Sequence, residues 1–498
     1  MKNLLKIKSF VIVFVTLGLF SSCEKLLEEN PKDRILPSNF FATESDAISA
    51  VNAVYGILNA KSSGTFGGVY HSNYWIIQGL ASDEMNNEMA GAVNEEALEQ
   101  FAHTPDNTVI FDVWQNIYSG IFYANFAVDG ITPMEIEEDL KNRLLGEARF
   151  LRAILYFDLV RMFGEVPLVT YENQSDLSPD KASTDEIFTF ILEDLAFAKA
   201  NLPESYPVGN GLGRATWGAA TAMLGRVNLW TGDYAAAVTN LEEVIDSDLY
   251  DLYPDFRDAF QIENENGQET VFGIGFGDGG GAISFWEVGQ FNVRLLPREL
   301  VSEISKANSQ GWQVPTQNLY DQYDDLDRRK TITFITEVNP PGGPVTVAPH
   351  FSKYWDRDSE PDAGNTEMDF PHIRYSGVLL MYAEALNELN DGPNTEAYNA
   401  INEVRRRARF DGTVDQNVLP DLSGLTYQQF KDAVLLERRL ELAAEGHRWF
   451  DLVRHGKLVE RVNAAKTGSA VQSFHTLFPL PQREVDLNPK LLPQNTGY

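Results

Sequence analysis

Aromatic side chains that stand beside amides and carboxylates carry the most specific chemistry in this chain. A flat ring can stack on the apolar face of a sugar ring, while amide, carboxylate and guanidinium groups bind the hydroxyls. Residues 71–87, 273–292 and 353–357 combine both kinds of group in loop-like sequence. We therefore predict a ligand-binding site formed by Trp286, Trp75, Tyr74, Trp355, Asn73 and Phe285. The alternative interpretation is that these rings anchor loops to the protein core.

Catalytic motifs are weak by comparison. The seven histidines include no pair at positions i and i+4 and no HExxH, so nothing indicates a zinc hydrolase. Gly275, Gly277 and Gly280 match GxGxxG, but the sequence after them is not helical, which argues against a dinucleotide site. The 72 acidic residues could include a glycosidase pair, because the separation of such a pair is spatial and not sequential. We expect no enzymatic activity, no cofactor and no catalytic metal, although loop carboxylates could bind calcium without a recognisable spacing.

The charge of the chain excludes one class of partner. Lys plus Arg number 40 and Asp plus Glu number 72, which gives a net charge of −32. An excess of negative charge repels phosphate backbones, so nucleic acid is not an expected partner.

The first 22 residues are typical of a signal peptide. Three lysines precede an apolar run at residues 10–20, and Ser21 and Ser22 follow it. The run has about 11 residues, whereas a membrane-spanning helix needs roughly 20. Cys23, the single cysteine of the chain, comes directly after the serines and is similar to the lipidated cysteine of a bacterial lipoprotein. We expect cleavage before Cys23, acylation of Cys23, and a tether over residues 23–34.

Apolar residues recur at helical spacing through most of the remaining chain. Single helices are predicted over residues 44–60, 109–129, 135–163 and 183–201. Residues 215–247 and 378–408 each contain two helical patterns around a tight turn, and they resemble tetratricopeptide helix pairs. Between these pairs, residues 250–375 are rich in Gly, Pro, Asp and aromatic residues and have no helical period. The sequence predicts a mainly α protein, with a helix-pair scaffold and a large irregular, loop-rich half that binds ligand.

Charged residues within the helical patterns have a structural explanation. Asp158 and Arg161 are neighbours on one helix face. The segment 437–451 places an arginine beside nearly every acid, which favours buried ion pairs over an acid and base cluster. His447 in this segment is given a structural role.

Four internal segments and the C-terminal ending resemble one family of proteins. These segments are residues 23–31, 146–170, 374–386, 437–457 and 477–498. Their order and spacing are similar to those of the SusD/RagB outer-membrane lipoproteins of Bacteroidota-type bacteria. Thr496 stands where the family ending would have a proline.

The resemblance implies a non-catalytic binding protein that is lipid-anchored in the cell outer membrane and faces the exterior. Such proteins capture an oligosaccharide or polysaccharide, or in some members a peptide, and deliver it to a SusC-like TonB-dependent transporter. The implied organisation is a single SusD-like unit over residues 35–498, with its scaffold at about 35–250 and 371–460, an irregular insertion at about 250–370 and a closing segment at 461–498. A lipid-anchored glycoside hydrolase and a scaffold that binds only protein remain alternatives. The sequence does not identify the ligand or the stoichiometry with the transporter.

Overall fold

The computed structural model describes residues 40–59, 68–173, 175–207, 211–277, 289–304, 308–359, 366–410 and 418–498. The chain forms two units, residues 1–46 and 47–498, which are described separately. In the first unit, the backbone amide and hydroxyl of Thr43 donate to the Asp46 carboxylate, at 2.8 and 2.7 Å. This side-chain cap begins helix α3 (Glu44–Asn59), which corresponds to the helix predicted over residues 44–60.

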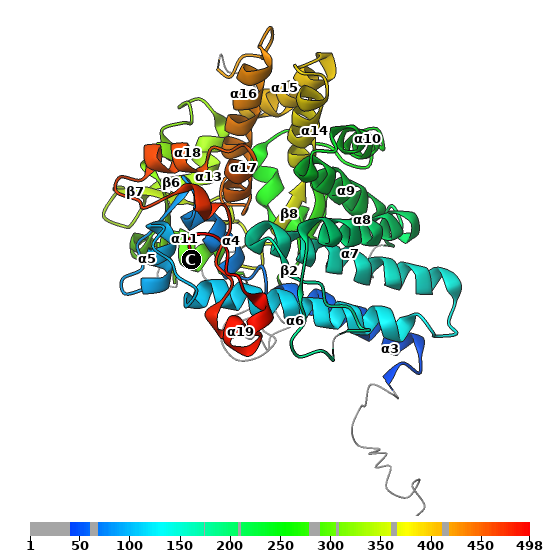
Figure 1. Ribbon diagram of the computed structural model, residues 1–498. Coiled ribbons are helices and arrows are strands. Elements are labelled where there is room, and N and C mark those ends of the chain that lie inside the picture. Colours follow the sequence, from blue (N-terminus) through cyan, green and yellow to red (C-terminus); the bar gives the residue numbers. More distant parts are fainter. Residues whose placement is uncertain are drawn as a thin grey trace, which may run out of the picture. The chain divides into compact units, whose positions relative to one another are not determined.

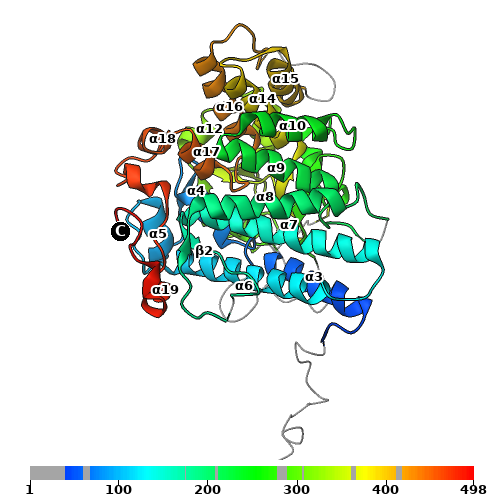
Figure 2. The same cartoon turned by 45° about the vertical axis from the view of Figure 1, so that its right-hand side comes forward.

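A layered array of helices dominates the second unit. Figures 1 and 2 show α10, α9, α8, α7 and α6 lying one beside the next, with α14, α15 and α16 beyond α10. Their bounds are α6 (Thr108–Ile131), α7 (Glu138–Phe163), α8 (Thr184–Asn201), α9 (Trp217–Thr231), α10 (Tyr234–Ile245), α14 (Tyr375–Leu389), α15 (Thr395–Arg409) and α16 (Tyr427–Glu441). Each of these helices packs on the next, as stacked helix pairs must in order to bury their apolar faces.

Helices α9 and α10 show how the sequence specifies one such pair. Gly232 ends α9 in the left-handed region, at φ 84°, and the Asp233 side chain accepts from the amide of Ala236 to begin α10. Gly225 faces Leu241 of α10 so closely that a Cβ at this position would lie 2.5 Å from Leu241 Cγ. The small residues of this segment therefore set the distance between the two helices.

The remaining elements are short. Within the described residues, the strands form four two-stranded antiparallel sheets: β1 (Met85–Asn87) with β5 (Gln313–Pro315), β2 (Val166–Pro167) with β3 (Lys181–Ala182), β4 (Thr270–Ile274) with β8 (Phe370–Arg374), and β6 (Phe334–Val338) with β7 (Val345–Phe351). The short helices are α4 (Asn73–Leu80), α5 (Val93–Glu99), α11 (Phe291–Leu295), α12 (Gln317–Tyr320), α13 (Arg328–Thr333), α17 (Arg448–Arg454), α18 (Leu458–Ala465) and α19 (Gln482–Leu487). Between α10 and α14 the described chain holds only such short elements and single-turn 3-10 helices. The predicted mainly α class with a loop-rich half is confirmed.

Buried ion pairs connect the scaffold to the irregular half. Glu441 and Glu445, near the end of α16, bind Arg374 at 2.9 and 2.8 Å, and Glu437 binds Arg329 at 2.7 Å. The network is completed by Glu269, Asp327, Lys353, Arg405 and Arg407. Five carboxylates thus face five cations. The prediction of paired structural charges in residues 437–451 is confirmed.

No helix in the described part of the chain is both long enough and apolar enough to span a bilayer.

Candidate ligand-binding site

Helix α4 carries three of the predicted site residues and buries all of them. Trp75 is 0% exposed, and its ring centroid lies 5.4 Å from that of Phe291. The Tyr74 hydroxyl donates to Asp158 Oδ1 at 2.8 Å, and burial raises the pKa of Tyr74 above its usual range. Asn73 is also buried and lies 3.5 Å from the Asp112 carboxylate. These rings have no free face for a ligand, so the structure corrects the prediction that Trp75, Tyr74 and Asn73 bind it. They anchor α4 in the core.

Phe285 and Trp286, the predicted ring pair of the glycine-rich segment, lie outside the described residues, as does Cys23. Their proposed roles stay predictions.

The acidic residues that follow α4 are buried as well. Asp83 Oδ1 accepts from Arg448 Nε at 2.7 Å, and Arg439 lies 3.2 Å away. Burial opposes ionisation of Asp83, but the two arginines outweigh it and lower the pKa of Asp83 to about 2. Glu84 beside it is 1% exposed, and its Oε1 has no hydrogen-bond partner in the described part of the chain. Burial raises the pKa of Glu84 to about 7.

Glu84→Gln is expected to flatten the pH dependence of stability near neutrality. In the unfolded chain Glu84 loses its proton near the ordinary pKa of 4.5, whereas the folded protein keeps this proton up to about pH 7. The stability that the protonated Glu84 contributes is therefore complete below pH 4.5 and is lost as the pH rises through 7. In the variant, the free energy of unfolding should decline less steeply between pH 5 and 7, by up to about 1.4 kcal/mol per pH unit. Denaturant unfolding at a series of pH values measures this slope. The same slope in both proteins would contradict it.

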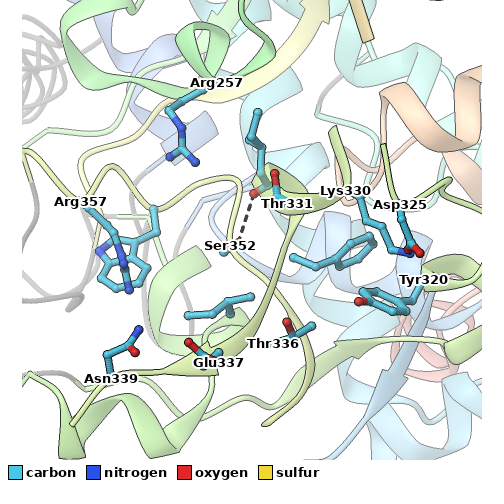
Figure 3. A pocket seen from close by; sticks show the side chains of 14 residues that line it. Arg257, Tyr320, Asp325, Lys330, Thr331, Thr336, Glu337, Asn339, Ser352 and Arg357 are labelled. Atoms are coloured by element: carbon cyan, nitrogen blue, oxygen red, sulfur yellow. Dashed lines mark hydrogen bonds and ion pairs between the residues drawn. The ribbon is translucent and has the colours of Figure 1, made fainter. Parts of the chain in front are cut away.

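Trp355, the third of the predicted tryptophans, lines an open cavity of about 420 Å³ (Figure 3). The cavity is built entirely from the irregular half, between residues 257 and 357. Its side chains are those of Arg257, Tyr320, Asp325, Lys330, Thr331, Ile332, Phe334, Ile335, Thr336, Glu337, Asn339, Ser352, Trp355 and Arg357. Aromatic rings and planar polar groups therefore share one concave surface, which is the combination that the sequence predicts for a ligand site.

Short elements hold this lining in place. Asp327 begins α13 by accepting from the Arg329 amide at 3.0 Å, and α13 runs directly into strand β6. Strand β7 pairs with β6, and Ser352, just after β7, donates from Oγ to the Ile332 carbonyl at 3.1 Å. At the base of the cavity, Trp355 packs against Leu296, Leu300 and Val338. The base of the cavity is thus part of a small apolar core.

Two cations lie against aromatic rings of the lining. The Arg357 guanidinium is 4.1 Å from the centre of the Trp355 ring and 3.5 Å from Glu303. Lys330 Nζ is 4.6 Å from the centre of the Tyr320 ring and binds Asp325 at 2.6 Å, a contact that lowers the pKa of the Asp325 carboxyl. Figure 3 shows Arg257 and Arg357 on one side of the cavity, and Tyr320, Lys330 and Asp325 on the other. Trp355 itself is 4% exposed, so a ligand that stacks on it must displace Arg357.

Several polar side chains of the lining are available to a ligand. Those of Arg257, Thr336, Glu337 and Asn339 make no hydrogen bond or ion pair with any residue that the structure describes. They offer guanidinium, hydroxyl, carboxylate and amide groups, which together can donate to and accept from sugar hydroxyls. The described chain contains no group of three or more His, Cys, Asp or Glu that could hold a metal ion.

A second cavity, of about 520 Å³, has a different character. It lies among α6, α19 and the residues around β2, and its side chains include Trp114, Tyr118, Phe122 and Leu487. The Tyr118 hydroxyl is already bound to the Pro167 carbonyl at 2.9 Å. The lining of this second cavity is more apolar than that of the first cavity, and fewer of its polar side chains lack partners in the described chain, so it is less suited to hydroxyl recognition.

Of the residues that line this cavity, the sequence prediction names Trp355, and Arg357 lies in the segment 353–357 that it singles out; Tyr320, Arg257 and Asn339 are not among the predicted residues. The signal available for Tyr320 is that it is an aromatic residue in an acidic, polar stretch, residues 317–327.

A scaffold of tetratricopeptide-like helix pairs, combined with an irregular half that carries a polar and aromatic cavity, defines a class of binding proteins. Two models of known protein families match the chain. A model described as the SusD family matches residues 338–498, and one described as starch-binding and associating with the outer membrane matches residues 38–229. The chain belongs to the SusD/RagB family, which confirms the resemblance seen in the sequence.

Relatives align along the whole chain. SusD-like protein P2 of Formosa agariphila is 29% identical over 521 residues, covering 99% of this chain and 100% of the relative. A crystal structure of a SusD homolog from Bacteroides thetaiotaomicron has a TM-score of 0.80 at 24% identity, covering 93% of this chain and 98% of that one. A laminarin-binding SusD-like protein has a TM-score of 0.75 at 25% identity, covering 91% and 99%.

Proposed function

We propose that this protein is a non-catalytic, carbohydrate-binding lipoprotein of the outer-membrane surface, and that it binds an oligosaccharide or polysaccharide in the cavity around Tyr320 and Trp355. The observation that carries the proposal is the cavity itself, where aromatic rings stand beside four polar side chains that have no hydrogen bond or ion pair within the described part of the chain. Membership of a family described as starch-binding, and similarity to a laminarin-binding protein, support carbohydrate as the ligand class.

Anchoring and delivery belong to the same proposal. Acylated Cys23 would hold the protein at the membrane, and a SusC-like TonB-dependent transporter would receive the ligand. Both follow from the family resemblance. Co-purification of the full chain with a β-barrel transporter from outer membranes, lost in Cys23→Ser, tests them together.

Tyr320→Ala is expected to weaken glycan binding about tenfold, because loss of a stacked ring costs on the order of 1 kcal/mol. Calorimetry or affinity electrophoresis against laminarin, starch and a panel of peptides measures the loss and separates carbohydrate from peptide binding. Phe122→Ala is the matched control, since Phe122 is an exposed aromatic residue of the second cavity. The control should bind as the wild type does.

Two outcomes would count against the proposal. If Trp286→Ala abolishes binding while Tyr320→Ala leaves it unchanged, the ligand contacts the glycine-rich segment and the cavity is misassigned. Release of shorter sugars from a bound glycan by the purified protein would favour the hydrolase alternative.

A further inference from the structure

A third, much smaller cavity lies in the core of the helical scaffold, and none of its lining residues lines the proposed ligand site. It has a volume of about 20 Å³ and is bounded by side chains of α7, α9, α14, α16 and α17. Four arginines line it: Arg161, Arg226, Arg438 and Arg454. A cavity of this size holds one small ion or one water molecule.

Three of the four arginines form ion pairs with acids around this cavity. Asp158 pairs with Arg161, and Asp451 Oδ2 accepts from Arg438 Nε at 2.8 Å. Glu384 pairs with Arg454, and it also lies 2.9 Å from His455 Nε2. All these groups are largely withdrawn from water.

Arg226 is the lining arginine that has no ion pair with any described residue. Its guanidinium hydrogen-bonds to the His372 carbonyl, at 3.4 Å, and to His447 Nδ1, at 3.0 Å, and it lies 5.9 Å from the centre of the Phe157 ring. Since Arg226 donates to it, this His447 nitrogen is an acceptor, and burial together with Arg226 lowers the pKa of His447 well below its usual range. His447 is therefore neutral and has the structural role that the sequence suggested. The cluster carries at least one uncompensated positive charge.

A hydrogen-bond donor in the cavity is also unsatisfied. Arg438 is 5% exposed, and its Nη1 has no hydrogen-bond partner among the described residues. A buried, unpaired guanidinium is costly, and an unmade hydrogen bond adds to that cost. A water molecule could accept the hydrogen bond but could not neutralise the charge.

We propose that this cavity binds a single small monovalent anion, chloride under ordinary conditions, held by the guanidinium groups of Arg226 and Arg438. The small volume favours a single-atom anion over sulfate, phosphate or an organic carboxylate. The site is separate from the carbohydrate site, and its role is to neutralise the core where five helices meet.

Halide substitution tests the site in the wild-type protein. Crystals grown in sodium bromide should show an anomalous peak beside Arg226 and Arg438. In solution, Tm should rise by about 2 °C or more when chloride replaces gluconate at constant ionic strength, because the anion binds only the folded state. Absence of the anomalous peak, together with equal Tm values in chloride and gluconate, would overturn the proposal.

Arg226→Met provides the second arm, because it removes the uncompensated charge and keeps a long side chain. The variant should lose the chloride dependence of Tm, whereas Arg406→Met should retain it, since Arg406 pairs with Asp421 at the surface. Full chloride dependence in Arg226→Met would place the responsible site elsewhere and overturn the assignment. If Arg226→Met does not fold, the bromide peak in the wild type decides.

Discussion

Arg374→Met is expected to destabilise the protein by about 5 kcal/mol, at the upper end of the cost of breaking a buried ion pair. Arg374 is 2% exposed and binds Glu269, Glu441 and Glu445, each of which is at most 1% exposed. Removing the guanidinium leaves three carboxylates without their shared partner. Burial acts to raise the pKa of Glu441, but Arg407, Arg374 and Arg329 together lower it below its usual range, so Glu441 stays charged and needs these cations.

Denaturant unfolding of Arg374→Met measures the loss. Arg406→Met is the control, because Arg406 has a half-exposed side chain and its pair with Asp421 is worth at most about 1 kcal/mol. Arg374→Lys should fall between the two, since it keeps the charge but loses the forked geometry. Equal losses in Arg374→Met and Arg406→Met would show that the network contributes little.

The sequence predicts that the charged residues of segment 437–451 are paired and buried, because that part of the pattern is local. Glu437, Glu441 and Glu445 recur at helical spacing with Arg438, Arg439 and Arg448 close to them in sequence, and such a pattern has few stable arrangements other than paired burial. The helix pair α9 and α10 was predictable for a similar reason, since its turn residues and small residues are close in sequence. The partners themselves, such as Arg374 and Arg329, come from segments that the pattern does not specify.

The ligand site depends on contacts that are distant in sequence, and there the predictions were less successful. Tyr74 and Trp75 look like exposed loop rings because polar residues surround them, yet Asp158, the acceptor for Tyr74, lies 84 positions away. Helix α4 is buried on all sides, so its sequence lacks the alternation of apolar and polar faces from which a half-buried helix is predicted. The cavity of Trp355 likewise requires residues 257, 320 and 355 to converge, which only the tertiary fold determines.

Asp158→Ala is expected to cost about 4 kcal/mol, because one buried carboxylate satisfies three groups. Asp158 accepts from the hydroxyls of Tyr70 and Tyr74, at 2.6 and 2.8 Å, and pairs with Arg161. The Arg161 guanidinium lies between two rings, 3.9 Å from the centre of Phe157 and 3.6 Å from that of Phe450. It is thereby held in the core and cannot reach water when its partner is removed.

Asp139→Ala is the matched control on the same helix, since Asp139 lies in the exposed first turn of α7 and its loss should cost less than about 1 kcal/mol. Denaturant unfolding compares the two variants, and an Asp158→Ala midpoint equal to that of Asp139→Ala would contradict the expected loss.

The Asp158→Ala substitution also bears on the anion cavity. Removing Asp158 adds a second uncompensated positive charge beside Arg226, so Asp158→Ala should depend on chloride more steeply than the wild type does. Chloride should therefore restore part of the stability that the carboxylate supplied, and an Asp158→Ala variant without this chloride effect would contradict the anion site.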